Sequence, residues 1–348
     1  MLDDIGMTQA ELARRTGRPL KTINEIVQGK TAIIPDTALQ LERVLRVPAS
    51  EWIALDAAYR EYQARLEEKA RLSSQTEWLH GFPWKDLVKL GLVKRGRDSA
   101  ETLDEVLRFL GVASPAAWED YWTGLGTAFR KSPRLSEKQG AIAAWLRIGE
   151  LAAREVVCAS FDMSSFRRSL PSIRALTRQA PEQFQPALVE TCAGAGVAVV
   201  FVPELTGTHV FGATRWVTPD KAVIQLSLRY KTDDQFWFTF FHDAGHIILH
   251  GKRGVFVDVP DAPQSEGNSE AEADSFAGDL LIPPADFQRL VEHGAPTTLE
   301  IVDAAERLGI GPGVIVGRLQ HDRILPSSRG NELKRRFELK EAQTKKCD

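Results

Sequence analysis

The stretch 233–250, DDQFWFTFFHDAGHIILH, decides the fold of the second half of this chain. It has the length of a buried helix, and after Gln235 it carries few polar residues before two histidines, His242 and His246. Residues four apart lie on the same face of an α-helix. The spacing therefore lets both imidazoles reach a single metal ion.

A downstream stretch supplies a candidate third ligand. Residues 270–283 read EAEADSFAGDLLIP, a second helix with apolar residues at helical spacing. Glu272 borders this apolar stripe and can point toward the first helix, and two histidines with one glutamate form a recurrent catalytic zinc set. Two other interpretations stay open: Glu272 is a solvated helix carboxylate, and His250 is the third ligand in its place.

HDAGHIILH, followed after a short insert by EADSFAGDLLIP, resembles the paired motif of the ImmA/IrrE metallopeptidases. Members of that family usually read HExxH and then E-A-N/D-x-F-A-x-x-L-L-x-P. The resemblance implies that His242, His246 and Glu272 bind Zn²⁺ and that Asp243 occupies the position of the catalytic glutamate. Because aspartate is one methylene shorter, three outcomes stay open: a slow enzyme, one that works through a bridging water, and a zinc-bound scaffold.

The N-terminal residues indicate a helix-turn-helix. Thr8-Gln9-Ala10-Glu11 is a capping box that starts one helix, which stops near Gly17. A second short helix begins at Pro19, and two such helices joined by a tight glycine-containing turn are typical of this motif. The sequence GMTQAELARRTGRPLKTINEIVQGK resembles that of the Xre/HigA repressors. Members of that family usually have a further helix before GMTQ.

A local basic patch makes this unit a candidate for binding operator DNA. Asparagine and glutamine can pair with adenine, and arginine and lysine with guanine or phosphate. The alternative is that these polar residues simply face water. The candidate DNA-binding residues are Arg18, Lys21, Thr22, Asn24, Gln28 and Lys30.

The pattern predicts an α+β protein in which an all-α helix-turn-helix and a helical connector precede a zincin-like domain with a small, mainly antiparallel sheet. The expected segments are residues 1–52 (helix-turn-helix), 53–190 (helical linker and connector), 191–325 (metallopeptidase-like domain) and 326–348 (polar tail). The charged helix at 51–71 serves as a linker or as a dimerisation helix. The strand at 211–217 is the expected sheet edge for substrate pairing, and His209 before it either approaches the metal or is merely exposed.

Composition narrows the class of protein. With 348 residues, 43% apolar, 26% charged and a net charge of −3, the chain is typical of a soluble protein without a global attraction to nucleic acid. Its 3 cysteines argue for a reducing compartment and against a disulfide framework. No apolar run is long enough to span a bilayer, and the start does not resemble a signal peptide. We therefore expect a cytoplasmic protein.

These features lead to two functional hypotheses. In the first, the chain is a transcriptional regulator whose zinc-dependent endopeptidase domain cleaves a repressor or antitoxin-like protein, with its own chain as another candidate, under stress. In the second, the domain is catalytically weak or inactive and serves an antitoxin-type DNA-binding repressor as a sensor or as a partner-binding module. Either form is expected to bind operator DNA and a protein partner and can act as a homodimer.

Overall fold

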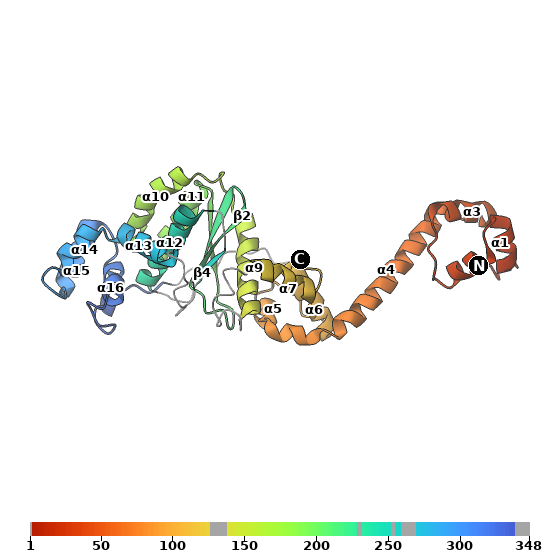
Figure 1. The fold of residues 1–348 in the computed structure, drawn as a ribbon, viewed down its shortest axis with the longest axis horizontal. Helices are drawn as coiled ribbons and strands as arrows, with labels where there is room; N and C mark the ends of the chain where they lie inside the picture. Colours follow the sequence, from red (N-terminus) through yellow and green to blue (C-terminus); the bar gives the residue numbers. More distant parts are fainter. Residues whose placement is uncertain (1, 126–137, 228–231, 252–254, 259–268, 338–348) are drawn as a thin grey trace. The chain divides into compact units, whose positions relative to one another are not determined.

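The computed structural model describes residues 2–125, 138–227, 232–251, 255–258 and 269–337. The chain divides into two compact units, Met1–Thr76 with Ser99–Glu101 and Glu77–Asp98 with Thr102–Asp348 (Figure 1). The first is helical and the second combines helices with a four-stranded sheet, so the α+β prediction is confirmed. Among the described helices, none has the length and apolar character needed to cross a bilayer.

Four helices make up the smaller unit: α1 (Gln9–Thr16), α2 (Leu20–Val27), α3 (Pro35–Leu45) and α4 (Ala49–Ser73). α1 begins where the sequence predicts, and the Thr8 hydroxyl accepts a hydrogen bond of 3.2 Å from the Glu11 backbone N–H. Only this half of the predicted capping box is formed, since the Glu11 carboxylate accepts a hydrogen bond from Arg15. It ends at Gly17, whose φ of 68° lies in the left-handed region that glycine tolerates best. The buried core of the motif consists of Leu12, Ala13, Ile23 and Leu41.

The helices between α4 and the sheet are α5 (Trp84–Lys89), α6 (Ser99–Leu110), α7 (Pro115–Leu125), α9 (Gln139–Glu155), α10 (Met163–Ala175) and α11 (Pro181–Ala193). Two tryptophans of α7, Trp118 and Trp122, stack with ring centroids 5.8 Å apart, and both are buried. Trp145 of α9 is completely buried. These tryptophans therefore pack in the interior of the protein.

The sheet has the strand order β1-β3-β2-β4. Its strands are β1 (Val197–Val202), β2 (Gly212–Thr218), β3 (Lys221–Ser227) and β4 (Phe256–Asp258). β1 and β3 run parallel, whereas β2 is antiparallel to both of its neighbours, so the sheet is mixed. The expectation that the 211–217 strand forms an edge is wrong, because β2 lies between β3 and β4 in the described part of the chain.

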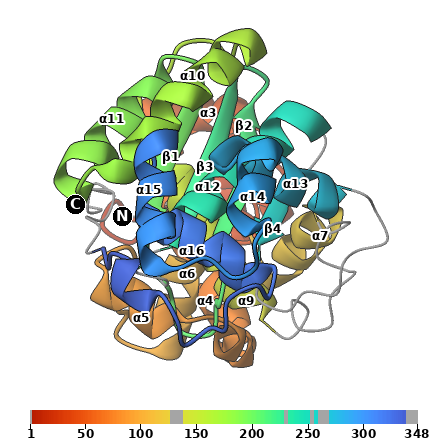
Figure 2. The same cartoon turned by 90° about the vertical axis from the view of Figure 1, so that its left-hand side faces the viewer.

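Each face of the sheet packs against different helices, because side chains alternate along a strand. On β3, Ile224 and Leu226 belong to the core that also contains the aromatic residues of α12 (Asp233–His250). Gln225 belongs to the other face, where its amide donates a hydrogen bond of 2.7 Å to the Trp145 carbonyl of α9. Figure 2 shows α12 at the centre of this unit, with β3 and α13 near it.

α12 is buried along most of its length, and four further α-helices follow it in the part of the chain that the structure describes. They are α13 (Ser269–Leu281), α14 (Pro284–Val291), α15 (Thr298–Leu308) and α16 (Pro312–His321). Trp237, Phe240 and Phe241 of α12 are each 0% exposed, so the helix is a central element of the core. Its histidines are therefore held on a rigid support.

A C-terminal segment, residues 331–337, fastens the start of α12; we call it the C-terminal strap. The Arg335 guanidinium donates to the buried Asp233 carboxylate (Nε to Oδ2, 3.2 Å) and to the carbonyls of Arg178 and Gln179 at 3.0 and 3.1 Å. Phe337 is only 2% exposed. The strap is thus packed, unlike the loose tail expected over 326–348, of which 338–348 lies outside the described residues.

Replacing the strap arginine should destabilise the larger unit. In Arg335→Ala, the buried Asp233 carboxylate loses its cationic partner and several carbonyls lose a donor. We expect the free energy of unfolding to fall by about 2–4 kcal/mol, measured by urea denaturation. Arg329→Ala, at an exposed position just before the strap, should change it by less than about 0.5 kcal/mol. Equal losses in the two variants would contradict the role of Arg335.

Candidate metal centre and DNA interface

α12 brings its two histidines together in the interior. His242 and His246 are 5% and 1% exposed, and their Nε2 atoms lie 2.9 Å apart. This is the pairing that the four-residue spacing predicts. Buried imidazoles whose Nε2 atoms face each other on one helix are arranged to share a cation.

The carboxylate that joins them comes from α13 and belongs to Glu270. Its Oε2 lies 3.3 Å from Nε2 of His242 and 3.5 Å from Nε2 of His246. Two ligands bound tetrahedrally at about 2.0–2.1 Å from one zinc ion stand about 3.3 Å apart. The separations fit a zinc ion, and His242, His246 and Glu270 form a cluster in the described part of the chain that could hold a metal ion.

Glu272, the residue expected from the sequence, is not part of this cluster. Two residues along an α-helix correspond to a rotation of about 200°, so Glu270 and Glu272 cannot face α12 in the same way. Glu272 instead places Oε2 3.0 Å from Nε2 of His250. The apolar stripe of α13, from which the sequence predicts the ligand, does not point to Glu270. The spacing from Glu270 to Asp274 does point to it. These residues are four apart, as His242 and His246 are on α12, so both face the same side of α13.

Further residues orient the two imidazoles. Asp274 Oδ1 lies 2.9 Å from Nδ1 of His242, which leaves Nε2 to face the cluster. Nδ1 of His246 lies 3.0 Å from Nδ1 of His250. His250 therefore contacts the back of His246 and is not the third member of the cluster. Each cluster imidazole is held from its Nδ1 side, as metal-binding histidines usually are.

The two helices can approach closely because Gly245 lies between the histidines. A Cβ at Gly245 would lie 3.1 Å from Phe276 Cδ1 and 3.3 Å from Ala273 Cα, tighter than ordinary contact. Ala273 is also small and completely buried. The small residues on both helices thus let the Glu270 carboxylate reach the histidines.

Local electrostatics favour the protonation states of metal ligands. Burial opposes ionisation of Glu270, but hydrogen bonds from His242 and His246 outweigh it and hold the pKa of this carboxyl well below its ordinary value. Burial lowers the pKa of His246, although the hydrogen bond with Glu270 raises it in part. An ionised carboxylate beside a neutral imidazole is the state that binds a metal.

Asp243 follows His242 and is 1% exposed. Its carboxylate lies against β2, because a Cβ at Gly212 would overlap Oδ2 of Asp243. The Thr214 hydroxyl donates to its backbone carbonyl at 3.4 Å. Asp243 is therefore a buried carboxylate held between α12 and the sheet. His209, in contrast, places Nδ1 3.5 Å from Glu204 and is not among the three residues of the cluster.

The predicted DNA-binding residues differ in their surroundings. Lys21 and Gln28 of the α2 region and Lys30 after it are exposed, and Thr22 and Asn24 are half-buried. Arg18 instead donates to Gln40 Oε1 at 2.6 Å and to the Asp36 carboxylate. Arg18 therefore fastens α3 to the turn before α2, whereas Lys21, Gln28 and Lys30 remain accessible to a nucleic acid.

Comparison with known families identifies both regions. Residues 196–320, which include the His242, His246 and Glu270 cluster, match the IrrE N-terminal-like domain of the M78 peptidases. Residues 2–52 match a helix-turn-helix family. The chain thus combines a helix-turn-helix DNA-binding domain with a metallopeptidase-like domain of a family that generally depends on zinc. No curated protein matches the chain.

Two neighbouring glutamates provide a matched test of the ligand set. In Glu270→Gln the cluster loses its carboxylate, and we expect zinc affinity to fall by more than about 100-fold. In Glu272→Gln only the support of His250 changes, and we expect a loss of at most about 10-fold. Competition with a chromogenic chelator measures both affinities. A larger loss for Glu272→Gln than for Glu270→Gln would reverse the assignment.

Proposed function

We propose that this chain, which joins a helix-turn-helix domain to an ImmA/IrrE-type peptidase domain, is a transcriptional regulator that cleaves another regulatory protein at a zinc-dependent site. One observation supports this most directly. His242, His246 and Glu270 converge at zinc-ligand separations, and the residue that follows His242 in the chain is the buried carboxylate Asp243. A metal-binding cluster next to a proton acceptor is the arrangement that peptide hydrolysis requires.

Each side chain has a defined task in this proposal. When bound, zinc supplies a Lewis acid that polarises a carbonyl and makes water more acidic. His242, His246 and Glu270 hold the ion, and Asp274 and His250 keep the imidazoles oriented. Asp243 accepts the proton from the attacking water and later delivers it to the leaving amine.

The length of Asp243 determines how fast this site works. Its carboxylate is drawn back from the position of a glutamate by roughly one C–C bond, about 1.5 Å. A displacement of about 1 Å can cost on the order of 100-fold in rate. The second candidate function follows from this short side chain: a zinc-bound domain without turnover that senses a ligand or binds a partner for an antitoxin-type repressor.

The substrate that we propose is a cytoplasmic repressor or antitoxin-like protein, with the chain itself as another candidate, cut in response to stress. The joined helix-turn-helix supports this choice, because operator DNA would bring the peptidase domain near other DNA-bound regulators.

Lengthening the carboxylate tests the enzymatic proposal. We expect Asp243→Glu to raise the rate of protein cleavage by about 10- to 100-fold, and Asp243→Asn to abolish cleavage with zinc still bound. The assay combines the zinc-loaded chain with helix-turn-helix regulators from the same cell and with a catalytically dead copy of the chain. Cleavage fragments are identified by mass spectrometry. If zinc binds and neither the wild type nor Asp243→Glu cleaves any of them, the sensor function is favoured.

We further propose that the chain acts on DNA as a homodimer joined through α4. From residue 53 to residue 71 no residue of this helix is buried. Four of its exposed large apolar residues, Leu55, Tyr59, Tyr62 and Leu66, are 43–62% exposed and follow the 4-3-4 spacing of a coiled-coil seam. A helix with such an apolar stripe in water is suited to pair with a second copy.

Charges placed on the α4 stripe should separate the dimer. In Leu55→Glu/Tyr62→Glu, like charges would meet within the seam. We expect light scattering to show a monomer and affinity for DNA to fall at least 10-fold. The DNA is a set of duplexes that the wild type selects from a random library. The control Ala57→Glu/Ala64→Glu adds the same charges at exposed positions on the opposite side of α4 and should remain dimeric. A monomeric wild type would refute the proposal.

A further inference from the structure

A groove with a volume of about 970 Å³ lies along α11, where that helix faces the end of α9 and the segment 156–159 that follows α9. We call it the acidic groove. α11 packs against β1, which also contributes to the lining (Figure 2). No residue of the metal cluster lines the groove, so it is a separate feature of this unit. Its apolar walls include Ala152, Val156, Val157, Pro186 and Val189.

Part of this apolar wall is open to water. Val157 is 92% exposed, and Val156 and Val189 are half-buried. A contiguous apolar surface exposed on a soluble protein often marks a place that another molecule covers. The volume of the groove is at the upper end of the range for small-molecule pockets, so it has room for a segment of a protein chain.

The charged residues that line the groove are all acidic. Glu155, Glu182 and Glu190 are exposed, and no lysine, arginine or histidine is found among the described residues of the lining. Glu182 and Glu190 both belong to α11 and are eight residues apart. This separation corresponds to about 12 Å along the helix axis and a rotation of about 80°, so the two carboxylates lie on the same side of α11. Pro186 and Val189 lie between them.

Pro186 adds a backbone acceptor to the same wall. A proline inside a helix has no N–H, so the carbonyl of Glu182, four residues earlier, lacks the donor that an α-helix ordinarily supplies. The α11 wall therefore presents two carboxylates and an acceptor carbonyl around a short apolar strip. Such a wall attracts cations and N–H donors as well as apolar groups.

The charge of the groove decides which class of partner it can bind. Three carboxylates repel the phosphates of nucleic acids and of anionic lipid surfaces. A partner with lysine or arginine on both sides of an apolar strip matches the charges and the apolar wall together. An amphipathic helix can repeat the spacing found on α11, because its residues eight apart also lie about 12 Å apart on one side.

We propose that the acidic groove is a docking site for an amphipathic helix of a partner protein, with two lysines or arginines eight residues apart and apolar residues between them. The two cations pair with Glu182 and Glu190, and the apolar residues cover Val157, Pro186 and Val189. Recognition of a helix through its apolar face in a groove is a recurring mode of protein association. The inference is independent of the zinc site and assigns a partner surface to another face of the same unit.

Binding of a designed peptide tests this assignment. The probe is a fluorescein-labelled peptide of about 15 residues with two lysines eight residues apart. Leucines stand at the third, fourth and seventh positions after the first lysine, and alanine or glutamine elsewhere. The full chain is titrated into the probe at low ionic strength, and binding is followed by fluorescence anisotropy. We expect a matching peptide with glutamates in place of both lysines to bind at least about 10-fold more weakly.

Two charge-matched variants locate the binding site. Glu182→Lys/Glu190→Lys should weaken binding of the lysine peptide at least about 10-fold and should bind the glutamate peptide in preference. Asp303→Lys/Glu306→Lys makes the same change of charge at exposed positions of α15 outside the groove and should bind as the wild type does. Both changes lie at the surface, so we expect both variants to fold.

The thiol of Cys158 reports whether the groove is occupied. Cys158 is half-buried and lines the groove, whereas Cys192 is completely buried. A saturating concentration of the lysine peptide should slow alkylation of Cys158 by iodoacetamide at least about 10-fold, measured by mass spectrometry of peptide digests. Absence of binding to the wild type, equal weakening in both variants, or unchanged alkylation of Cys158 would overturn the docking site. None of these outcomes depends on zinc, so they leave the proposed peptidase function as it stands.

Discussion

The close contact between α12 and α13 is the constraint on which the rest of the site depends. The metal centre uses ligands from two helices, and those ligands are useful only if the helix axes lie near each other. Gly245 and Ala273 allow this close approach, because a Cβ added at Gly245 would already lie too close to Ala273. The sheet, the strap and α16 all pack around α12. They keep the helix in place while α13 supplies the carboxylates.

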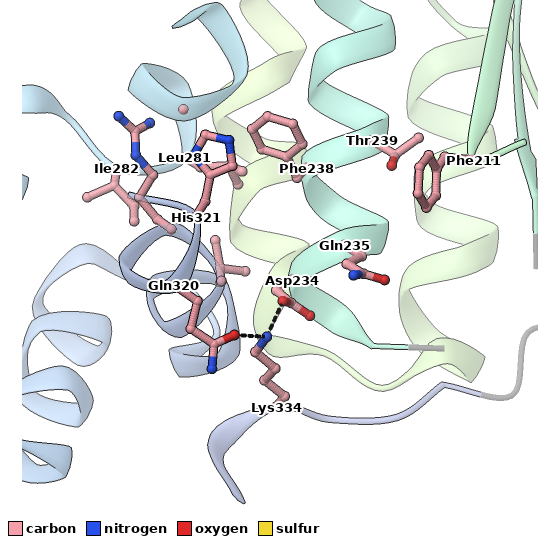
Figure 3. A pocket seen from close by; sticks show the side chains of 14 residues that line it. Phe211, Asp234, Gln235, Phe238, Thr239, Leu281, Ile282, Gln320, His321 and Lys334 are labelled. Carbon is pink, nitrogen blue, oxygen red and sulfur yellow. Dashed lines mark hydrogen bonds and ion pairs between the residues drawn. The ribbon is translucent and has the colours of Figure 1, made fainter. Parts of the chain in front are cut away.

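This arrangement also brings a cavity close to the candidate metal centre. The same two helices that carry the candidate ligands also line a cavity of about 440 Å³ (Figure 3), here called the pocket, without an intervening loop. Residues on packed helices are held more precisely than residues on loops. The distance between the cluster and the pocket is thus set by the helical rise rather than by a flexible connection.

The sequence predicted those parts of the site that depend on local periodicity. His242 and His246 could be assigned because four residues bring side chains to one helix face, and the capped α1 and the turn at Gly17 followed from local residue preferences. The choice between Glu270 and Glu272 depended on how α13 rotates against α12, which an apolar stripe does not define to within two residues. The inner position of β2 and the contacts of Arg18 with α3 arise between distant segments. No pattern within a single helix or strand contains that information.

The C-terminal strap has a consequence for how the domain can be switched off. Arg335 and Phe337 reach back across more than a hundred residues to hold the first turn of the ligand-bearing helix. A protease that nicked the chain between Leu325 and Arg335 would leave every metal ligand in place covalently, yet would release the anchor at the base of their helix. A single cut outside the cluster would then loosen the helix that carries both histidines, without removing any residue of the cluster.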